Sequence, residues 1–147
     1  MKLNELAKQY LADNIHMQLA TLRDGQPWLC TVYFVADDKL NLYWTSGRDR
    51  QHSLEILENP TSAVTIVHDV ENKQALQITG KASEVQNDDL EWVHALYVAK
   101  FGAKDYDLSA MRQRTDNGRS YWRFAPNSIS FWDEVNFPDS PKQILDI

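Results

Sequence analysis

The strongest constraint on the fold is a series of apolar segments that have a period of two and are separated by tight-turn residues. Within residues 40–45, leucine and tryptophan alternate with asparagine, tyrosine and threonine, a pattern typical of β-strands. Residues 15–22 and 28–36 are also apolar, and turn residues follow each of them, at 24–27 and 37–39. We therefore predict that residues 15–45 form a three-stranded meander joined by tight hairpins.

Further along the chain, the pattern predicts more strands and a few helices. Strands are expected over residues 63–68, 74–85, 121–125 and 129–132, with a bend at Pro126 and Asn127 before the last. Helices are expected over residues 4–13, 46–59, 87–101 and 108–114, with Asp49 capping the second and Gly102 ending the third. The tail after Val135 is expected to be irregular.

Six or seven strands with inserted helices predict a mainly β fold with peripheral helices. We expect an antiparallel split β-barrel of Greek-key type, formed as a single domain by residues 1–147. Such closure of the sheet removes exposed strand edges. The nearly continuous apolar strand at residues 28–35 is expected to be buried on both faces, which indicates a partner surface in addition to a core.

Composition narrows the function classes. The net charge of −6 argues against nucleic-acid binding, which needs a positive field. No apolar run approaches the roughly 20 residues that cross a bilayer, and the polar start does not resemble a secretory signal. The single cysteine, Cys30, fits a reducing cytoplasm, where we expect the protein. The four histidines lack metal-ligand spacing, so no metal is expected.

The stretch from Leu40 to Pro60 combines features of an anion site. A strand enters a turn at Gly47 and a helix follows at once, so unpaired N–H groups and the positive end of the helix dipole are available there. Hydroxyl and basic side chains surround this junction: Thr45, Ser46, Ser53, Arg48, Arg50 and His52. The composition is that of a phosphate site, and it is equally typical of a well-capped helix with solvated arginines.

These residues resemble the phosphate-binding segment of the pyridoxamine 5'-phosphate oxidase-like split barrels. Arg50-x-His52-Ser53 is similar to a subgroup with Arg-His-Ser, where the vitamin oxidases have an Arg-Lys pair. Other segments follow in the family's order: Asp24–Trp28 as the first hairpin, Ala75–Val85 as a later strand, and Tyr121–Trp132 as the closing hairpin. The resemblance spans about residues 15–134.

The resemblance implies FMN bound where two copies of the chain meet in a homodimer. Cofactor contacts are then expected from three segments: Cys30, Thr31, Val32 and Tyr33 along the ring, Trp44, Thr45, Ser46, Arg50, His52 and Ser53 around the phosphate, and Gln77 with Trp132. Gln77 and Gln74 are neighbours of Ala75, where the vitamin oxidases have glutamine. Trp132 should point away from the barrel interior, either toward the other subunit's flavin or into a dimer interface without touching it.

The family implies an FMN-dependent oxidoreductase that acts on a small molecule with a nicotinamide or similar electron donor. The alternatives are a non-catalytic flavin, deazaflavin or haem binder, and a barrel that dimerises without a cofactor. The vitamin oxidases' C-terminal Arg-Leu-His segment has no counterpart in residues 135–147, which argues against oxidation of pyridoxamine phosphate. No catalytic residue stands out. Three arginines either contact a phosphate-bearing substrate or nicotinamide, or are solvated: Arg112, Arg114 and Arg119.

Overall fold

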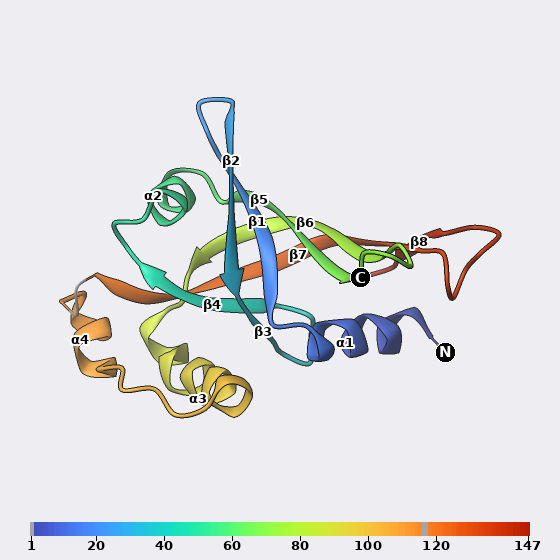
Figure 1. Cartoon of the computed structure of the whole chain (residues 1–147). Helices are drawn as coiled ribbons and strands as arrows, with labels where there is room; N and C mark the ends of the chain where they lie inside the picture. Colours follow the sequence, from blue (N-terminus) through green and yellow to red (C-terminus); the bar gives the residue numbers. More distant parts are fainter. Residues whose placement is uncertain (1, 116–117) are drawn as a thin grey trace.

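A computed structural model describes residues 2–115 and 118–147 (Figure 1). The helices are α1 (Leu3–Asp13), α2 (Gln51–Glu58), a 3-10 turn (Asn87–Asp89), α3 (Leu90–Phe101) and α4 (Leu108–Gln113). The strands are β1 (His16–Arg23), β2 (Gln26–Tyr33), β3 (Val35–Ala36), β4 (Leu42–Gly47), β5 (Thr61–Asp69), β6 (Gln74–Glu84), β7 (Arg119–Asp133) and β8 (Lys142–Leu145). In these described residues no helix has the length and hydrophobicity to cross a membrane.

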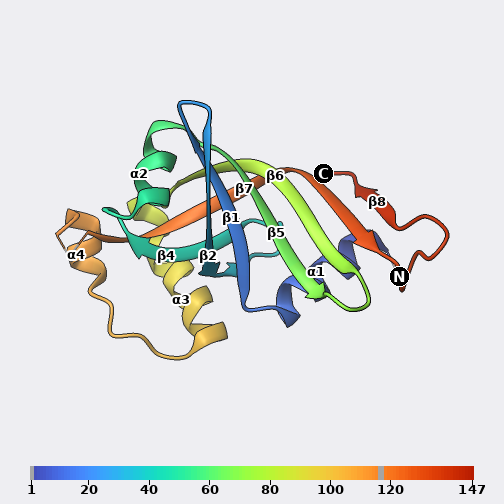
Figure 2. The same ribbon diagram turned by 45° about the horizontal axis from the view of Figure 1, so that its top comes forward.

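The strands form one curled antiparallel sheet. Its order is β2-β1-β5-β6-β7-β4-β3, and β8 pairs with the far half of β7. β2 and β4 contact each other across the opening of the curl, although they are not paired as neighbouring strands. Figures 1 and 2 both show α1 and α2 at opposite ends of β1. The predicted split barrel is therefore confirmed.

Two apolar clusters fill the structure on opposite faces of β4 and β7. The barrel interior contains Leu19, Trp44, Ile66 and Phe131, together with residues of α1 and Ile56 of α2. The second cluster lies between the sheet and α3, and its members include Tyr43, Val93, Tyr97, Met111 and Tyr121. Because successive side chains of a strand point to opposite faces, β4 supplies Trp44 to the first cluster and Tyr43 to the second.

The predicted meander is only partly correct. The β1–β2 hairpin forms, with Arg23 opposite Gln26. The chain then breaks at Phe34, whose ring is fully buried and whose N–H donates to the Ile15 carbonyl, so β3 continues at the other end of the sheet beside β4. β2 is also not buried on both faces within one chain, because the side chain of Leu29 is 64% exposed.

The predicted closing hairpin is wrong, as is the irregular tail. β7 is one strand of 15 residues that runs through Pro126. A register shift between Thr79 and Gly80 of β6 accommodates the proline, and a Cβ on Gly80 would lie 2.2 Å from the Ala125 carbonyl oxygen. After Val135 the chain returns as β8, which is held against β7 by buried Leu145.

Candidate cofactor site

The junction between β4 and α2 has the geometry that the anion-site prediction requires. α2 begins at Gln51, and its cap residue is Arg50 in an extended conformation, so the prediction of Asp49 as the cap is wrong. In the described chain no side chain accepts a hydrogen bond from the first turn of α2. The N–H groups at the start of a helix have no partner within it, and they carry a partial positive charge. They are therefore available to an anion.

Ser46 and His52 lie together at this junction. The Ser46 Oγ is 2.9 Å from the His52 Nε2. Burial lowers the pKa of His52 below 6.5, and the nearby positive charge of Arg50 lowers it further. The imidazole is therefore neutral near pH 7, and it acts at this site as a hydrogen-bonding group without charge.

Two hydroxyls beside this pair have no partner among residues 2–115 and 118–147. The Ser53 Oγ, in the first turn of α2, is fully buried and makes no hydrogen bond to any residue that the structure describes. The same is true of the Ser120 Oγ, on β7 directly opposite Ser46. An unsatisfied buried polar group costs about 1–3 kcal/mol. Such hydroxyls therefore indicate a group that the protein alone does not supply.

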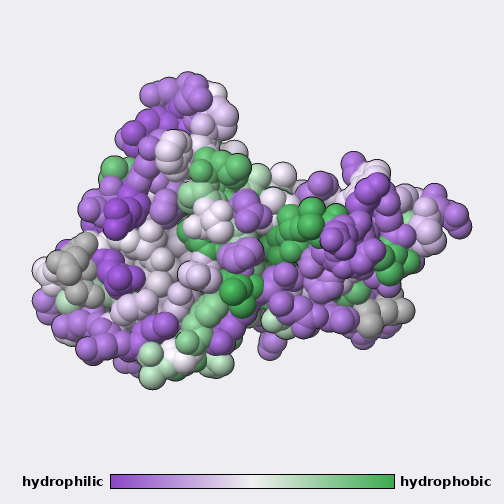
Figure 3. Space-filling view, in the orientation of Figure 1, coloured by the Kyte–Doolittle hydropathy of each residue, from purple (hydrophilic) through white to green (hydrophobic). Residues whose placement is uncertain are grey.

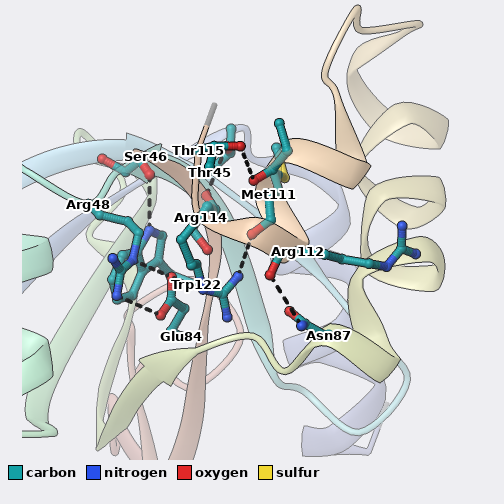
Figure 4. Close-up of polar contacts among 12 residues, drawn as sticks. Thr45, Ser46, Arg48, Glu84, Asn87, Met111, Arg112, Arg114, Thr115 and Trp122 are labelled. Atoms are coloured by element: carbon teal, nitrogen blue, oxygen red, sulfur yellow. Dashed lines mark hydrogen bonds and ion pairs between the residues drawn. The ribbon is translucent and has the colours of Figure 1, made fainter. Parts of the chain in front are cut away.

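Of the two arginines beside the junction, only Arg50 is free to provide charge. It is exposed and forms no ion pair with the residues described. Arg48 instead turns to Glu84, with its Nε 2.8 Å from the carboxylate, and Arg114 approaches the same carboxylate at 3.5 Å (Figure 4). Arg48 is therefore engaged by Glu84, a carboxylate that it shares with Arg114, whereas Arg50 is not.

Arg119 is one of the three arginines expected either to contact a substrate or to be solvated, and it is held by contacts within the chain. Its guanidinium lies 4.5 Å from the centre of the Tyr106 ring and 3.4 Å from the Thr45 Oγ1. Thr45 itself donates to the Ser120 carbonyl. Arg119 is thus fixed beside β4, on the face opposite Ser46, whereas Arg112 pairs with Glu91. Only the register of β7 against β4, which sequence does not reveal, brings Arg119 there.

Trp44, the other predicted contact on β4, is a core residue. Its side chain is fully buried in the barrel interior, and its Nε1 has no partner in the described chain. Thr45 and Ser46, at the exposed end of the strand, are half-buried.

The predicted ring-lining segment lies on β2, at the end of the sheet. Cys30 and Val32 pack against the barrel core, while Thr31 and Tyr33 face outward. The order of the sheet leaves one backbone edge of β2 without a neighbouring strand. Burial raises the pKa of Cys30 to about 11, assisted by the negative charge of Glu55, so the thiol stays protonated at neutral pH.

Gln77 and Trp132 lie together on the outer face of the sheet. Gln77 is opposite Ser130, and Trp132, 41% exposed, is opposite Ala75. The outward direction of Trp132 is confirmed. Gln74, the other glutamine beside Ala75, is buried, and its amide donates hydrogen bonds to the Tyr10 hydroxyl and the Asp133 carboxylate. One chain therefore presents two separate groups of predicted residues: one at the β4–α2 junction and the β2 edge, and one on the outer face.

The outer face carries exposed apolar side chains. Four of them belong to β2, β5, β7 and β8, and they are Leu29, Val67, Trp132 and Ile144. Figure 3 shows hydrophobic patches over the middle of the molecule, between hydrophilic ends. A separate cavity of about 460 Å³ lies between the β1–β2 hairpin and α2, and its lining includes Trp28, Gln51 and Glu55.

The fold defines a split-barrel protein, and the β4–α2 junction is its candidate anion site. The family model described as pyridoxamine 5'-phosphate oxidase matches residues 3–133. The chain belongs to this family of split barrels. It is 26% identical over 136 residues to the UPF0306 protein PM1958 of Pasteurella multocida. The aligned residues cover 90% of this chain and 86% of that protein.

Solved structures with less than a quarter of their residues identical confirm the fold. General stress protein 26 of Bacillus anthracis has 18% identity and a TM-score of 0.70, with all of both chains covered. HutZ, the haem storage protein of Vibrio cholerae, has 20% identity and a TM-score of 0.66 over 86% of this chain and 92% of its own. An F420 reductase has 22% identity and a TM-score of 0.63 over 84% and 94%.

Proposed function

We propose that this protein is an FMN-binding flavoprotein, a homodimer that acts as an oxidoreductase on a small molecule with a nicotinamide or similar electron donor. The observation that carries the proposal is the uncapped start of α2, with Arg50 exposed beside it and the Ser53 hydroxyl buried without a partner in the part of the chain that the structure describes. Backbone N–H groups, a guanidinium and a free hydroxyl together match the phosphate of FMN.

The residues present fit the rest of the cofactor. The free edge of β2 at Cys30–Tyr33 offers backbone N–H and C=O groups to the polar rim of a flavin ring. The ring accepts and donates hydride when bound, so the protein needs to hold it and exclude water. The neutral His52 orients Ser46, and Arg119 fixes Thr45.

A homodimer would unite the two groups of residues. The outer face carries Gln77 and Trp132, which lie away from the β4–α2 junction of their own chain. In a two-fold dimer, any contact that one copy makes is repeated by the other. The outer face of each copy would therefore cover the β2 edge of its partner. The exposed Leu29 and Trp132 supply apolar area for such a contact.

A second candidate is flavin binding without turnover. It is favoured because two titratable groups of the site are already engaged: the His52 ring is hydrogen-bonded to Ser46, and burial holds the Cys30 thiol protonated. A haem storage protein and an F420 reductase share the fold, so haem and deazaflavin are further ligands to compare.

The first experiment is the visible spectrum of the purified protein, with identification of what denaturation releases. FMN absorption, or its appearance after FMN is added, supports the proposal; a colourless protein that ignores FMN contradicts it. Reduction by NADH or NADPH that outpaces the reduction of free FMN separates the oxidoreductase from the non-catalytic binder.

Ser53→Ala gives a sharper test of the phosphate site. The substitution removes a hydroxyl that has no partner among the described residues, so the free energy of unfolding without ligand should stay the same or rise. FMN affinity should nevertheless fall, and Arg50→Ala/Ser53→Ala should weaken it about 100-fold or more. Lys8→Ala, which removes an exposed charge on α1 at the opposite end of β1 from α2, is the control and should bind FMN normally.

A further inference from the structure

A second polar cavity lies on the α3 side of β4, on the face opposite Ser46. Its volume is about 600 Å³, within the range of small-molecule sites. It opens between α3 and the segment that joins β3 to β4, which lie near each other in Figure 1. Its lining consists of Ala36, Asp37, Asp38, Lys39, Asn41, Tyr43, Asp89, Trp92, Leu96 and Arg123.

Arg123 is the unusual residue of this cavity. It lies on β7 opposite Tyr43, and its Nε is buried. Its guanidinium makes no hydrogen bond or ion pair with any residue in the described part of the chain. Partly buried arginines normally have an anionic or carbonyl partner, because desolvation of the charge is costly. Among the described residues Arg123 lacks an acceptor, so its guanidinium is available to one that a ligand brings.

The carboxylate of Asp37 does not fill this role. It accepts hydrogen bonds from the backbone N–H of Lys39 and Asn41, from the Asn41 side chain, and from the Tyr43 hydroxyl at 2.9 Å. These four donors fix the β3–β4 segment and the Tyr43 ring. The wall of the cavity is thus set before any ligand arrives.

Trp92 forms a rigid aromatic wall. Its Nε1 donates to the Asp89 Oδ1 at 2.9 Å, and its ring meets the Tyr43 ring edge to face at a centroid distance of 5.4 Å. The side chain is nonetheless 43% exposed. An indole that is held in place and still open to solvent is a surface on which a planar ligand can stack.

The charges around the cavity limit the ligand further. The lining contains three carboxylates, those of Asp37, Asp38 and Asp89, and two cations, Lys39 and Arg123. A simple anion would satisfy Arg123 but would be repelled by the carboxylates. A molecule without net charge that brings an acceptor for Arg123 and a donor for Asp89 or Asp38 satisfies both.

We propose that this cavity is a binding site for a small aromatic molecule of no net charge that places an acceptor group on Arg123, a donor group on an acidic side chain, and its ring against Trp92. Purine nucleosides and zwitterionic aromatic amino acids share this chemistry. The site is independent of the proposed FMN site, because none of its lining residues belongs to the β4–α2 junction.

The test follows the Arg123 Nε–H signal by NMR while guanosine and, separately, L-phenylalanine are added. Binding of one probe with a dissociation constant of about 1 mM or tighter, with a shift of that signal, is expected. A shift of the signal with guanosine identifies the ligand class as purine nucleosides. A shift with L-phenylalanine identifies it as aromatic amino acids. The proposal is overturned if neither probe shifts the signal, or if binding occurs without a change at Arg123.

Variants confirm the location. Arg123→Gln and Asp89→Asn should each weaken binding about tenfold or more, because each leaves a buried group of the complex unpaired. Trp92→Phe keeps a ring and should weaken it less than Trp92→Ala. Arg112→Gln, whose partner is Glu91 outside the cavity, is the matched control and should leave binding unchanged. Uptake of FMN by each variant shows that the variant is folded. If Arg123→Gln binds the probe as tightly as the unchanged protein does, the proposed role of Arg123 is refuted.

Discussion

The hydroxyl of Tyr10 donates a 2.5 Å hydrogen bond to the Asp133 Oδ2, and 123 positions of the chain separate the two residues. Gln74 and Asn136 complete the network, each donating to both the Tyr10 oxygen and the Asp133 carboxylate. Asp133 is fully buried. The network joins α1 to the ends of β6 and β7, at the opposite end of the barrel from α2.

Tyr10→Phe should therefore destabilise the fold. The substitution keeps the ring, which stacks on His68, and removes only the hydroxyl, so the Asp133 carboxylate loses its shortest hydrogen bond. Hydrogen bonds to charged groups contribute about 1.5–3 kcal/mol, and a loss of that size in urea unfolding is expected. Tyr33→Phe, at an exposed ring on β2, is the control. Equal losses in the two variants would refute a role for the network.

The same network should make stability depend on pH in acid. Burial alone would raise the pKa of Asp133, but the hydrogen bonds from Asn136, Tyr10 and Gln74 outweigh it and lower the pKa below 3.8. A carboxylate whose pKa is lower in the folded state stabilises the fold above its unfolded pKa, and this stability is lost as pH falls through the folded value. The free energy of unfolding should thus fall more steeply below about pH 4 in the unchanged protein than in Asp133→Asn. Parallel pH profiles would contradict this assignment.

Cys30 should react slowly with thiol reagents. With a pKa of about 11, raised first by burial and then by the charge of Glu55, almost none of the thiol is ionised at pH 8. Alkylation by iodoacetamide at pH 8 should be at least tenfold slower than for a free cysteine, whose pKa is about 8.5. Glu55→Gln should speed it modestly. A rate like that of free cysteine would show that the thiol is not held in its buried position.

The outer face of the sheet should mediate dimerisation. Leu29→Glu places a charge among the exposed apolar side chains of that face, so it should shift the protein toward monomer in sedimentation velocity. Val70→Glu, in the turn between β5 and β6 and 77% exposed, is the matched control and should not. Monomeric unchanged protein, or a Leu29→Glu dimer as stable as the original, would contradict the interface.

Local patterns predicted the elements better than their pairing. The period of two identified the strands, and Gly102, with a φ of 89°, ends α3 as expected. The hydropathy pattern gave wrong boundaries where contacts between residues far apart in the sequence determine how a segment folds. Phe34 enters the core and splits one apolar run into β2 and β3, and buried Leu145 draws the tail back as β8. Neither effect has a local signal.

The candidate site shows the same division. The hydroxyl and basic residues around Gly47 identified the junction, and the structure places Ser46, His52 and Ser53 there. Whether an arginine is free or paired depends on partners far along the chain: Glu84 takes Arg48, and the register of β7 brings Arg119 to Thr45. The sequence could therefore indicate the candidate site but could not say which of its charged side chains are paired.

If the start of α2 binds a phosphate, the protein distinguishes FMN from riboflavin, because the two molecules differ only in that group. Titration of cofactor-free protein should give an FMN affinity about 100-fold or more above that for riboflavin, and Arg50→Ala/Ser53→Ala should remove most of the difference. Equal affinities for FMN and riboflavin would contradict the account.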